Sequence, residues 1–264
     1  MGEGAGSPTS SASLEPFTTA DRAALVEAMN VAGYAVIPDA LSPDAIAAAQ
    51  QFVRTELVTT HGEFFSVVGG DAVRGTVLHE LGESESFREL LADLASAALG
   101  RPIAPERPYQ VLRIVASETG IAPYHHFHFD AYAVTAAVPL LIPDEPGIPC
   151  GDFVLYPNIR GPRRTIVRNL AEKAVVQNRR SGRVLGSSRA RRLLRARTLK
   201  LEPGNVYLFW GYRSLHGNDP CMSGRVRATG LFHVGNPHEG SAITRRIQSS
   251  RVRRTEVERK LMEG

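Results

Sequence analysis

A histidine and an aspartate stand two residues apart in the stretch from Tyr124 to Leu141, as His128-Phe129-Asp130. If this stretch is a β-strand, side chains at positions i and i+2 point to the same face, so the imidazole and the carboxylate can reach one metal ion. His216, which follows the apolar run 206–210, is the candidate for a third ligand. Two histidines and one carboxylate on one side of an ion form a set that binds Fe(II) and leaves other coordination positions open.

A guanidinium group lies downstream of His216 at a spacing that suggests a role in the same site. Arg227 comes eleven residues after His216, and strand alternation would place Arg225, Arg227 and Thr229 on one face. A buried guanidinium needs an anion, and its planar fork matches a carboxylate. A dicarboxylic cosubstrate that chelates the metal through one end would present such a carboxylate at its other end.

Taken together, these residues resemble the Fe(II)/2-oxoglutarate-dependent dioxygenases, and most closely their phytanoyl-CoA dioxygenase-like branch. The resemblance covers most of residues 20 to 237. The motifs that carry it are His128-Phe129-Asp130, the segment 203–209 leading to Leu215-His216-Gly217, Arg227-Ala228-Thr229, and the opening segments 33–38 and 41–44.

The resemblance implies roles for individual residues. His128, Asp130 and His216 would bind Fe(II), and Arg227 would pair with the distal carboxylate of 2-oxoglutarate. Further candidates for contacts to this cosubstrate are Thr229, Thr135 and Arg113, of which the last two could also be ordinary strand residues.

The same resemblance implies a reaction. The enzyme would consume O2 and 2-oxoglutarate, release succinate and CO2, and hydroxylate a small-molecule metabolite of the kind found in specialised metabolism. Desaturation, epoxidation and ring formation are alternative outcomes of this chemistry.

Four further side chains are candidates for substrate contacts. His126 shares a strand face with His128, but it could equally orient a ligand or donate to a backbone carbonyl. Tyr132 and Trp210 could form an aromatic wall, although a lone Trp on an apolar strand belongs by default to the core. Arg225 is the alternative to Arg227. We assign no role to the remaining nearby histidines, His125, His233 and His238.

The segment 160–200 has the most unusual composition in the chain. It contains fourteen Lys or Arg and a single acid, Glu172, although the whole chain carries a formal net charge of only +4. Such asymmetry indicates an anionic substrate or partner. We expect residues 157–198 to form a basic, partly helical insertion, which would be either a lid over the site or a solvated surface segment.

Two other functional classes remain open. A cupin-like metal enzyme that does not use 2-oxoglutarate would recruit more histidines and would not need Arg227. A non-catalytic module would use the basic insertion to bind an anion or a nucleic acid. The insertion lacks the interleaved aromatic side chains on which bases stack, which argues against a nucleic acid.

Composition sets the broad class. A chain of 264 residues, 43% hydrophobic and 22% charged, fits one large globular domain. No segment has the apolar length of a membrane span, and the N-terminus lacks the basic and apolar regions of a secretory signal. Two cysteines, Cys150 and Cys221, are too few for a disulfide framework and fit a reducing, cytoplasmic location. The oligomeric state stays open.

Helical periodicity dominates the first hundred residues and strand periodicity the rest, which predicts an α+β chain whose β part is a double-stranded β-helix, or jelly roll. We expect a disordered leader (1–18), a single oxygenase domain (19–240) and a C-terminal basic helix or tail (241–264). A capping box is expected at Ser86 to Glu89. The expected strands are 34–37, 109–115, 127–141, 152–156, 199–202, 206–210 and 227–234; the expected helices run from 19 or 20, from 43 to 57, up to Gly100, and within the insertion over 169–176 and 188–194.

Overall fold

A computed structural model describes residues 17–59, 65–116, 127–144, 151–161, 179–221 and 224–237. Several expectations lie outside these residues: the leader as far as residue 16, His126, the insertion helix at 169–176 and the tail from 241 onward. Among the described residues, no helix combines the length with the apolar composition that a bilayer span requires.

Four α-helices and a short 3-10 helix make up most of the N-terminal part. Thr18 and Asp21 form a reciprocal capping box at the start of the first helix, and Ser42 accepts a hydrogen bond from Ala45 N at the start of the second. Gly100, with φ 65°, ends the last one in the left-handed conformation that glycine adopts without strain. The elements are α1 (Thr19–Val31), α2 (Pro43–Thr59), η1 (Gly70–Val73), α3 (Val77–Glu83) and α4 (Glu85–Leu99).

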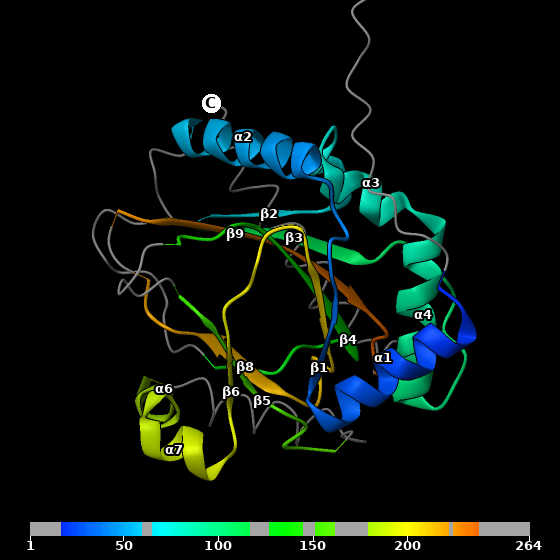
Figure 1. The fold of residues 1–264 in the computed structure, drawn as a ribbon, viewed down its shortest axis with the longest axis vertical. Helices are drawn as coiled ribbons and strands as arrows, with labels where there is room; N and C mark the ends of the chain where they lie inside the picture. The colour runs from blue at the N-terminus through cyan, green and yellow to red at the C-terminus, as the bar shows by residue number, and fades with distance from the viewer. Residues whose placement is uncertain are drawn as a thin grey trace, which may run out of the picture.

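Two antiparallel sheets face each other (Figure 1). The larger has the order β1-β7-β4-β9-β3-β2, and the smaller has the order β6-β5-β8. The mixed helix and antiparallel-sheet class is therefore confirmed. The strands are β1 (Tyr34–Ile37), β2 (Phe65–Val68), β3 (Tyr109–Ala116), β4 (Val134–Leu141), β5 (Phe153–Tyr156), β6 (Arg197–Leu199), β7 (Val206–Phe209), β8 (Leu215–Asn218) and β9 (Val226–Val234).

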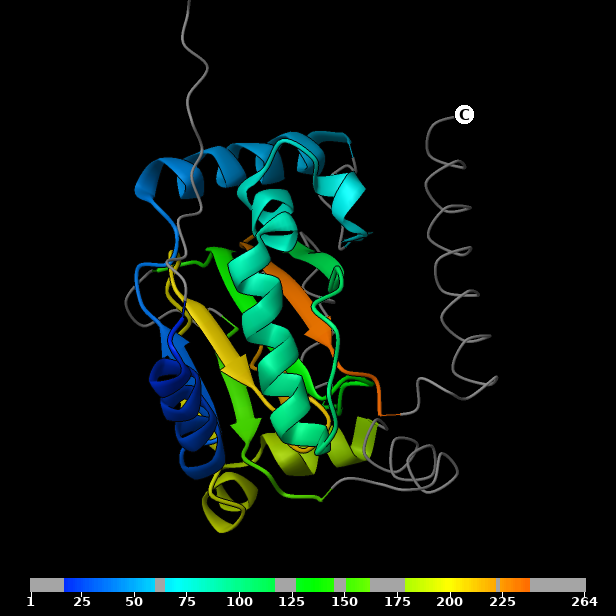
Figure 2. The same cartoon turned by 90° about the vertical axis from the view of Figure 1, so that its right-hand side faces the viewer.

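Strand alternation divides the larger sheet into two faces. On β9, Ala228 and Phe232 point outward into the main hydrophobic core, where the N-terminal helices cover the sheet (Figures 1 and 2). Phe87 of α4 packs edge-on against Phe232, with ring centroids 5.2 Å apart. The other face of the sheet turns toward the smaller sheet. The helices thus support a sheet whose inner face is free to carry a site.

A smaller cluster joins the two sheets. Phe153 and Leu155 of β5 pack with Ala137 of β4 and with Tyr207 and Phe209 of β7. Burying these apolar groups keeps the sheets together along one part of the sandwich, and the polar side chains gather beside it.

The basic segment contributes two short helices, α6 (Arg179–Gly186) and α7 (Ser188–Leu193). Arg191 of α7 forms a two-pronged ion pair with Asp219, just after β8, and the Tyr156 hydroxyl donates to the Leu185 carbonyl. These contacts attach the helices to the smaller sheet, although α6 was not expected from the sequence.

Three expected elements differ from the structure. The expected strand 127–141 is interrupted: residues 131–133 bend, and before them only His128 forms an isolated β-bridge. The strand expected at 199–202 lies earlier, over β6, and the strand β8, which carries His216, was missed altogether. The capping box expected at Ser86 is wrong, because Ser84 is the N-cap and accepts from Phe87 N.

The assignment of Ser84 as the N-cap of α4 can be tested directly with two variants. Ser84→Ala should lower the free energy of unfolding by about 0.5–2 kcal/mol, because the Phe87 amide loses its partner. Ser86→Ala, already inside the helix, should change it less, since alanine favours a helix interior. Urea denaturation of both variants measures the difference, and a larger loss in the Ser86 variant would contradict this assignment.

Candidate metal centre

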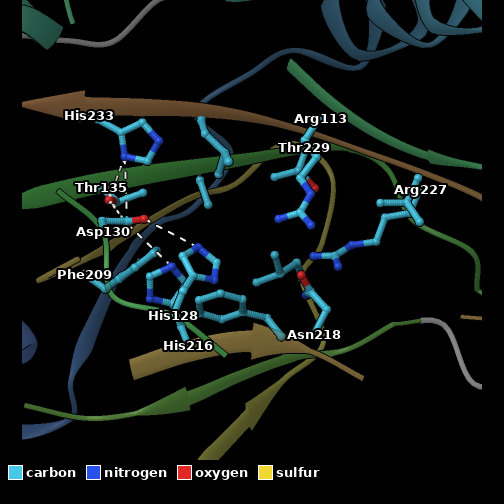
Figure 3. A pocket seen from close by; sticks show the side chains of 15 residues that line it. Arg113, His128, Asp130, Thr135, Phe209, His216, Asn218, Arg227, Thr229 and His233 are labelled. Carbon is cyan, nitrogen blue, oxygen red and sulfur yellow. Dashed lines mark hydrogen bonds and ion pairs between the residues drawn. The ribbon is translucent and has the colours of Figure 1, made fainter. Parts of the chain in front are cut away.

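His128 and His216 are brought together by backbone pairing. His128 N donates to His216 O at 2.9 Å, and His216 N donates to His128 O at 3.0 Å. The two rings lie side by side with centroids 4.4 Å apart (Figure 3). Two histidines that are 88 positions apart in the chain are therefore held as direct cross-strand neighbours.

Asp130 completes the cluster. Its N–H donates to the Gly211 carbonyl at 2.9 Å, which turns the chain so that the carboxylate faces the imidazoles. Oδ1 lies 3.6 Å from His128 Nε2, and Oδ2 lies 3.5 Å from His216 Nε2. One ligand atom from each of the three residues lies within 4.8 Å of the others, so a single ion could contact all three.

The electrostatics of the cluster favour a cation. Burial alone would raise the pKa of Asp130, but the three neighbouring imidazoles, His216 first, outweigh it and hold the pKa well below its usual value. The carboxylate is therefore ionised. His216 Nδ1 lies 3.1 Å from the Ser214 carbonyl, which fixes the proton on Nδ1 and leaves the Nε2 lone pair for a metal.

A pocket of about 130 Å³ extends from this cluster between the sheets. Four alternate residues of β9 line it in turn: Arg227, Thr229, Leu231 and His233. The histidine stands at the metal end, and Arg227 stands at the far end (Figure 3). The pocket therefore has a metal-binding end and a cationic end, with apolar wall between them.

The cationic end holds two arginines, of which Arg227 is buried and Arg113 is half-buried. Burial, and then the charge of Arg113, lowers the pKa of Arg227 to about 10, so Arg227 stays protonated at neutral pH. Burial also lowers the pKa of Arg113, against the attraction of Asp130. Thr229 is paired with Arg113 across β3 and β9, and its hydroxyl oxygen is buried without a hydrogen-bond partner among the described residues. A buried cation beside an orphan hydroxyl is suited to an anionic ligand.

The other sequence candidates fall in different places. Thr135 lines the pocket at the metal end, where it contacts Asp130 and not the arginines. Tyr132 is not among the pocket-lining residues and stacks on Tyr109 and His233. Trp210 lies in the hydrophobic core and donates to Asn30 Oδ1, so it is no pocket wall. Arg225 precedes β9 and does not line the pocket in the described part of the chain.

Three residues that shape the site were not predicted from the sequence. His233 was given no role, although extending the alternation of Arg227 and Thr229 by two more steps reaches it. Asn218 lies two residues after His216 on β8 and was hidden because that strand was not recognised. Nothing in the sequence around Gly211 predicts its role, because that role depends on the side chains of Asp130 and Thr135, which the fold brings close to it.

No protein-family model and no curated protein matches this chain. Solved structures do match. A Pseudomonas putida prolyl-4-hydroxylase has a TM-score of 0.51 and 12% identity, over 81% of this chain and 98% of that chain. The non-heme α-ketoglutarate dependent carbocyclase SnoK from nogalamycin biosynthesis has a TM-score of 0.51 and 16% identity, over 91% and 94%. EvdO2 from Micromonospora carbonacea var. aurantiaca, solved with 2-oxoglutarate, has a TM-score of 0.51 and 17% identity, over 84% and 93%. At these identities the similarity establishes a shared fold.

Gly211 offers a test of the cluster geometry. A Cβ at this position would lie 2.5 Å from both Asp130 Oδ2 and Thr135 Oγ1, so Gly211→Ala should displace the carboxylate. We expect Co(II) affinity to fall by at least ~10-fold, the scale found when partners of metal ligands are disturbed. Gly161→Ala, where a Cβ meets nothing within 4 Å among the residues that the structure describes, is the matched control. Equal affinities in a Co(II) titration of the two variants would contradict the geometry.

Proposed function

We propose that this protein is an Fe(II)/2-oxoglutarate-dependent oxygenase that acts on a small-molecule substrate. His128, Asp130 and His216 would hold Fe(II), and the pocket beside them would hold 2-oxoglutarate. The observation that carries the proposal is the presence of two complementary ends in one pocket. One end has a His-Asp-His cluster, and the other has a buried arginine beside a hydroxyl that has no hydrogen-bond partner in the described part of the chain.

The residues present fit both groups. Two neutral imidazoles and one carboxylate are the ligand set of non-heme Fe(II) centres that keep positions open. At the far end, Arg227 would pair with the distal carboxylate of 2-oxoglutarate, and the Thr229 hydroxyl would donate to it. Ala137 and Leu231, which face each other across β4 and β9, would pack against the methylene groups between the two carboxylates. Arg113 would add a second positive charge.

When bound, the iron and 2-oxoglutarate supply oxygen activation coupled to decarboxylation, with succinate and CO2 as products. The chain's own part is to orient the cosubstrate and to keep bulk water from the reacting groups. Phe209 and Phe153 pack around His216, with ring centroids 4.9 and 5.7 Å from its imidazole, and give this side of the site an apolar wall.

From the motifs we infer that the chain belongs to the phytanoyl-CoA dioxygenase-like branch and that the outcome of its reaction is hydroxylation. The similar structures include a hydroxylase and a carbocyclase, so this fold supports more than one outcome. The excess of arginine on and just after α6 and α7, with Arg189 and Arg192 exposed on α7 and Arg195 exposed beyond its end, supports an anionic or carrier-bound substrate.

The alternatives explain less of the pocket. A cupin-like enzyme without 2-oxoglutarate has no use for the buried Arg227 and the orphan Thr229 hydroxyl. A non-catalytic module that binds an anion or a nucleic acid through the basic helices has no use for the three clustered ligands. Its binding would also fall steeply with salt and survive His128→Ala.

Turnover tests the proposal. Wild-type protein given Fe(II), 2-oxoglutarate and O2 should form succinate, and a screen of small metabolites should reveal one that accelerates it. His128→Ala should reduce succinate formation to the background of free iron, because one of the three ligands is gone. Equal rates in the wild type and this variant, or no succinate with any metabolite tried, would contradict the proposal.

Arg227 gives a separate prediction about the cosubstrate. Arg227→Ala should weaken 2-oxoglutarate binding by about 10–100-fold, the effect of losing a hydrogen-bonded charge partner worth about 1.5–3 kcal/mol. Arg225→Ala is the matched control and should leave the affinity unchanged, because that side chain does not line the pocket. Anaerobic titration of the metal-loaded proteins measures both. A loss of 2-oxoglutarate affinity in the Arg225 variant alone would assign the carboxylate contact to Arg225 and contradict the role of Arg227.

A further inference from the structure

Thr135 and His233 form a direct cross-strand pair beside the metal cluster. They are opposite each other in the register of β4 and β9, and the same row continues to Tyr109 on β3 and to Phe209 on β7. Residues opposite each other on antiparallel strands project from the same face, with their Cβ atoms about 5 Å apart. The row therefore places a hydroxyl and a third imidazole at the metal end of the pocket.

A hydrogen-bonded chain runs through this pair to Asp130 (Figure 3). Thr135 Oγ1 lies 2.6 Å from Asp130 Oδ2 and 3.0 Å from His233 Nδ1. The ionised carboxylate can only accept, so the single hydroxyl proton goes to Asp130. Thr135 must then accept from His233, which fixes the imidazole proton on Nδ1.

The His233 ring is held in place from its other side. It stacks on Tyr132 with ring centroids 5.5 Å apart and planes 23° apart, and it contacts Tyr109 at 6.0 Å. Tyr109 and Tyr132 stack on each other at 5.6 Å. Packing against these two aromatic rings keeps the His233 imidazole oriented with its Nδ1–H toward the Thr135 hydroxyl.

Space for the chain depends on Gly211. Its missing side chain leaves room for both Thr135 Oγ1 and Asp130 Oδ2, each of which would lie 2.5 Å from a Cβ. The same residue accepts the Asp130 N–H. Backbone and side chain of Asp130 are thus fixed by neighbours that are not metal ligands.

We propose that Thr135 and His233 are positioning residues that hold the Asp130 carboxylate in the orientation that binds the metal ion. The chain His233 Nδ1–H to Thr135 Oγ1–H to Asp130 Oδ2 prevents rotation of the carboxylate, so the ligand set is formed before the ion arrives. This inference rests on the proposed function for the identity of the ion, but it concerns metal binding and not turnover.

The test is a Co(II) titration of the full-length apo-protein, followed through the visible d–d absorption of the bound ion. Thr135→Val removes the hydroxyl at nearly constant shape and should weaken Co(II) binding by about 10–100-fold and change the absorption envelope. Thr135→Ser restores the hydroxyl and should restore both affinity and spectrum to near wild type. A merely structural role for Thr135 would leave the spectrum of the bound ion unchanged.

Two variants of His233 provide an independent test. His233→Asn keeps an amide donor near the position of Nδ1, and His233→Phe keeps the aromatic stack but has no donor. The Phe variant should bind Co(II) more weakly than the Asn variant. Circular dichroism and thermal melting check that each variant folds. If Thr135→Val does not fold, the comparison of Co(II) affinity between the two His233 variants tests the proposal.

The outcomes separate this inference from the proposed function. Wild-type affinity and spectrum in both Thr135→Val and His233→Phe would overturn the positioning role, while the oxygenase proposal would stand. Absence of succinate formation in a wild type that binds Co(II), with weakened binding in the variants, would overturn the oxygenase proposal and support the positioning role.

Discussion

A negative charge at Asp130, largely shielded from solvent, is the constraint on which this site depends. An ionised carboxylate inside a protein is costly unless it is paired and hydrogen-bonded. Here the Thr135 hydroxyl, the surrounding imidazoles and the space beside Gly211 stabilise it without consuming all of its acceptor capacity. The capacity that remains is what a metal ion would use, so the stability of the charge and the function of the site have the same cause.

Each of the two sheets contributes different residues to the pocket. The smaller sheet carries His216 on β8, and backbone pairing with His128 brings the other imidazole to it. The larger sheet carries Arg113, Thr229 and Arg227, and its outer face is buried under the N-terminal helices. Since helices anchor one face of this sheet, the other face can hold buried charges at fixed positions. A pocket between the sheets combines a metal-binding end with a cationic end.

The sequence predicted much of this arrangement for clear physical reasons. Alternation along β9 and the two-residue spacing of His128 and Asp130 are local properties, so both could be read directly from the chain. The role of Gly211 could not, because it depends on the approach of residues 76 to 81 positions away. The bend after Asp130 was hidden by an apolar run that looks like one continuous strand. Trp210 was ambiguous for a similar reason: alternation does not say which face of a sheet the helices will cover.

We propose that one ferrous ion and one 2-oxoglutarate share the pocket between the sheets. Anaerobic addition of Fe(II) and 2-oxoglutarate to the apo-protein measures this most directly. We expect the weak visible charge-transfer band of a keto acid chelated to ferrous iron, and we expect His216→Ala to lose this band. A folded wild-type protein that binds Fe(II) but develops no band with 2-oxoglutarate would contradict it.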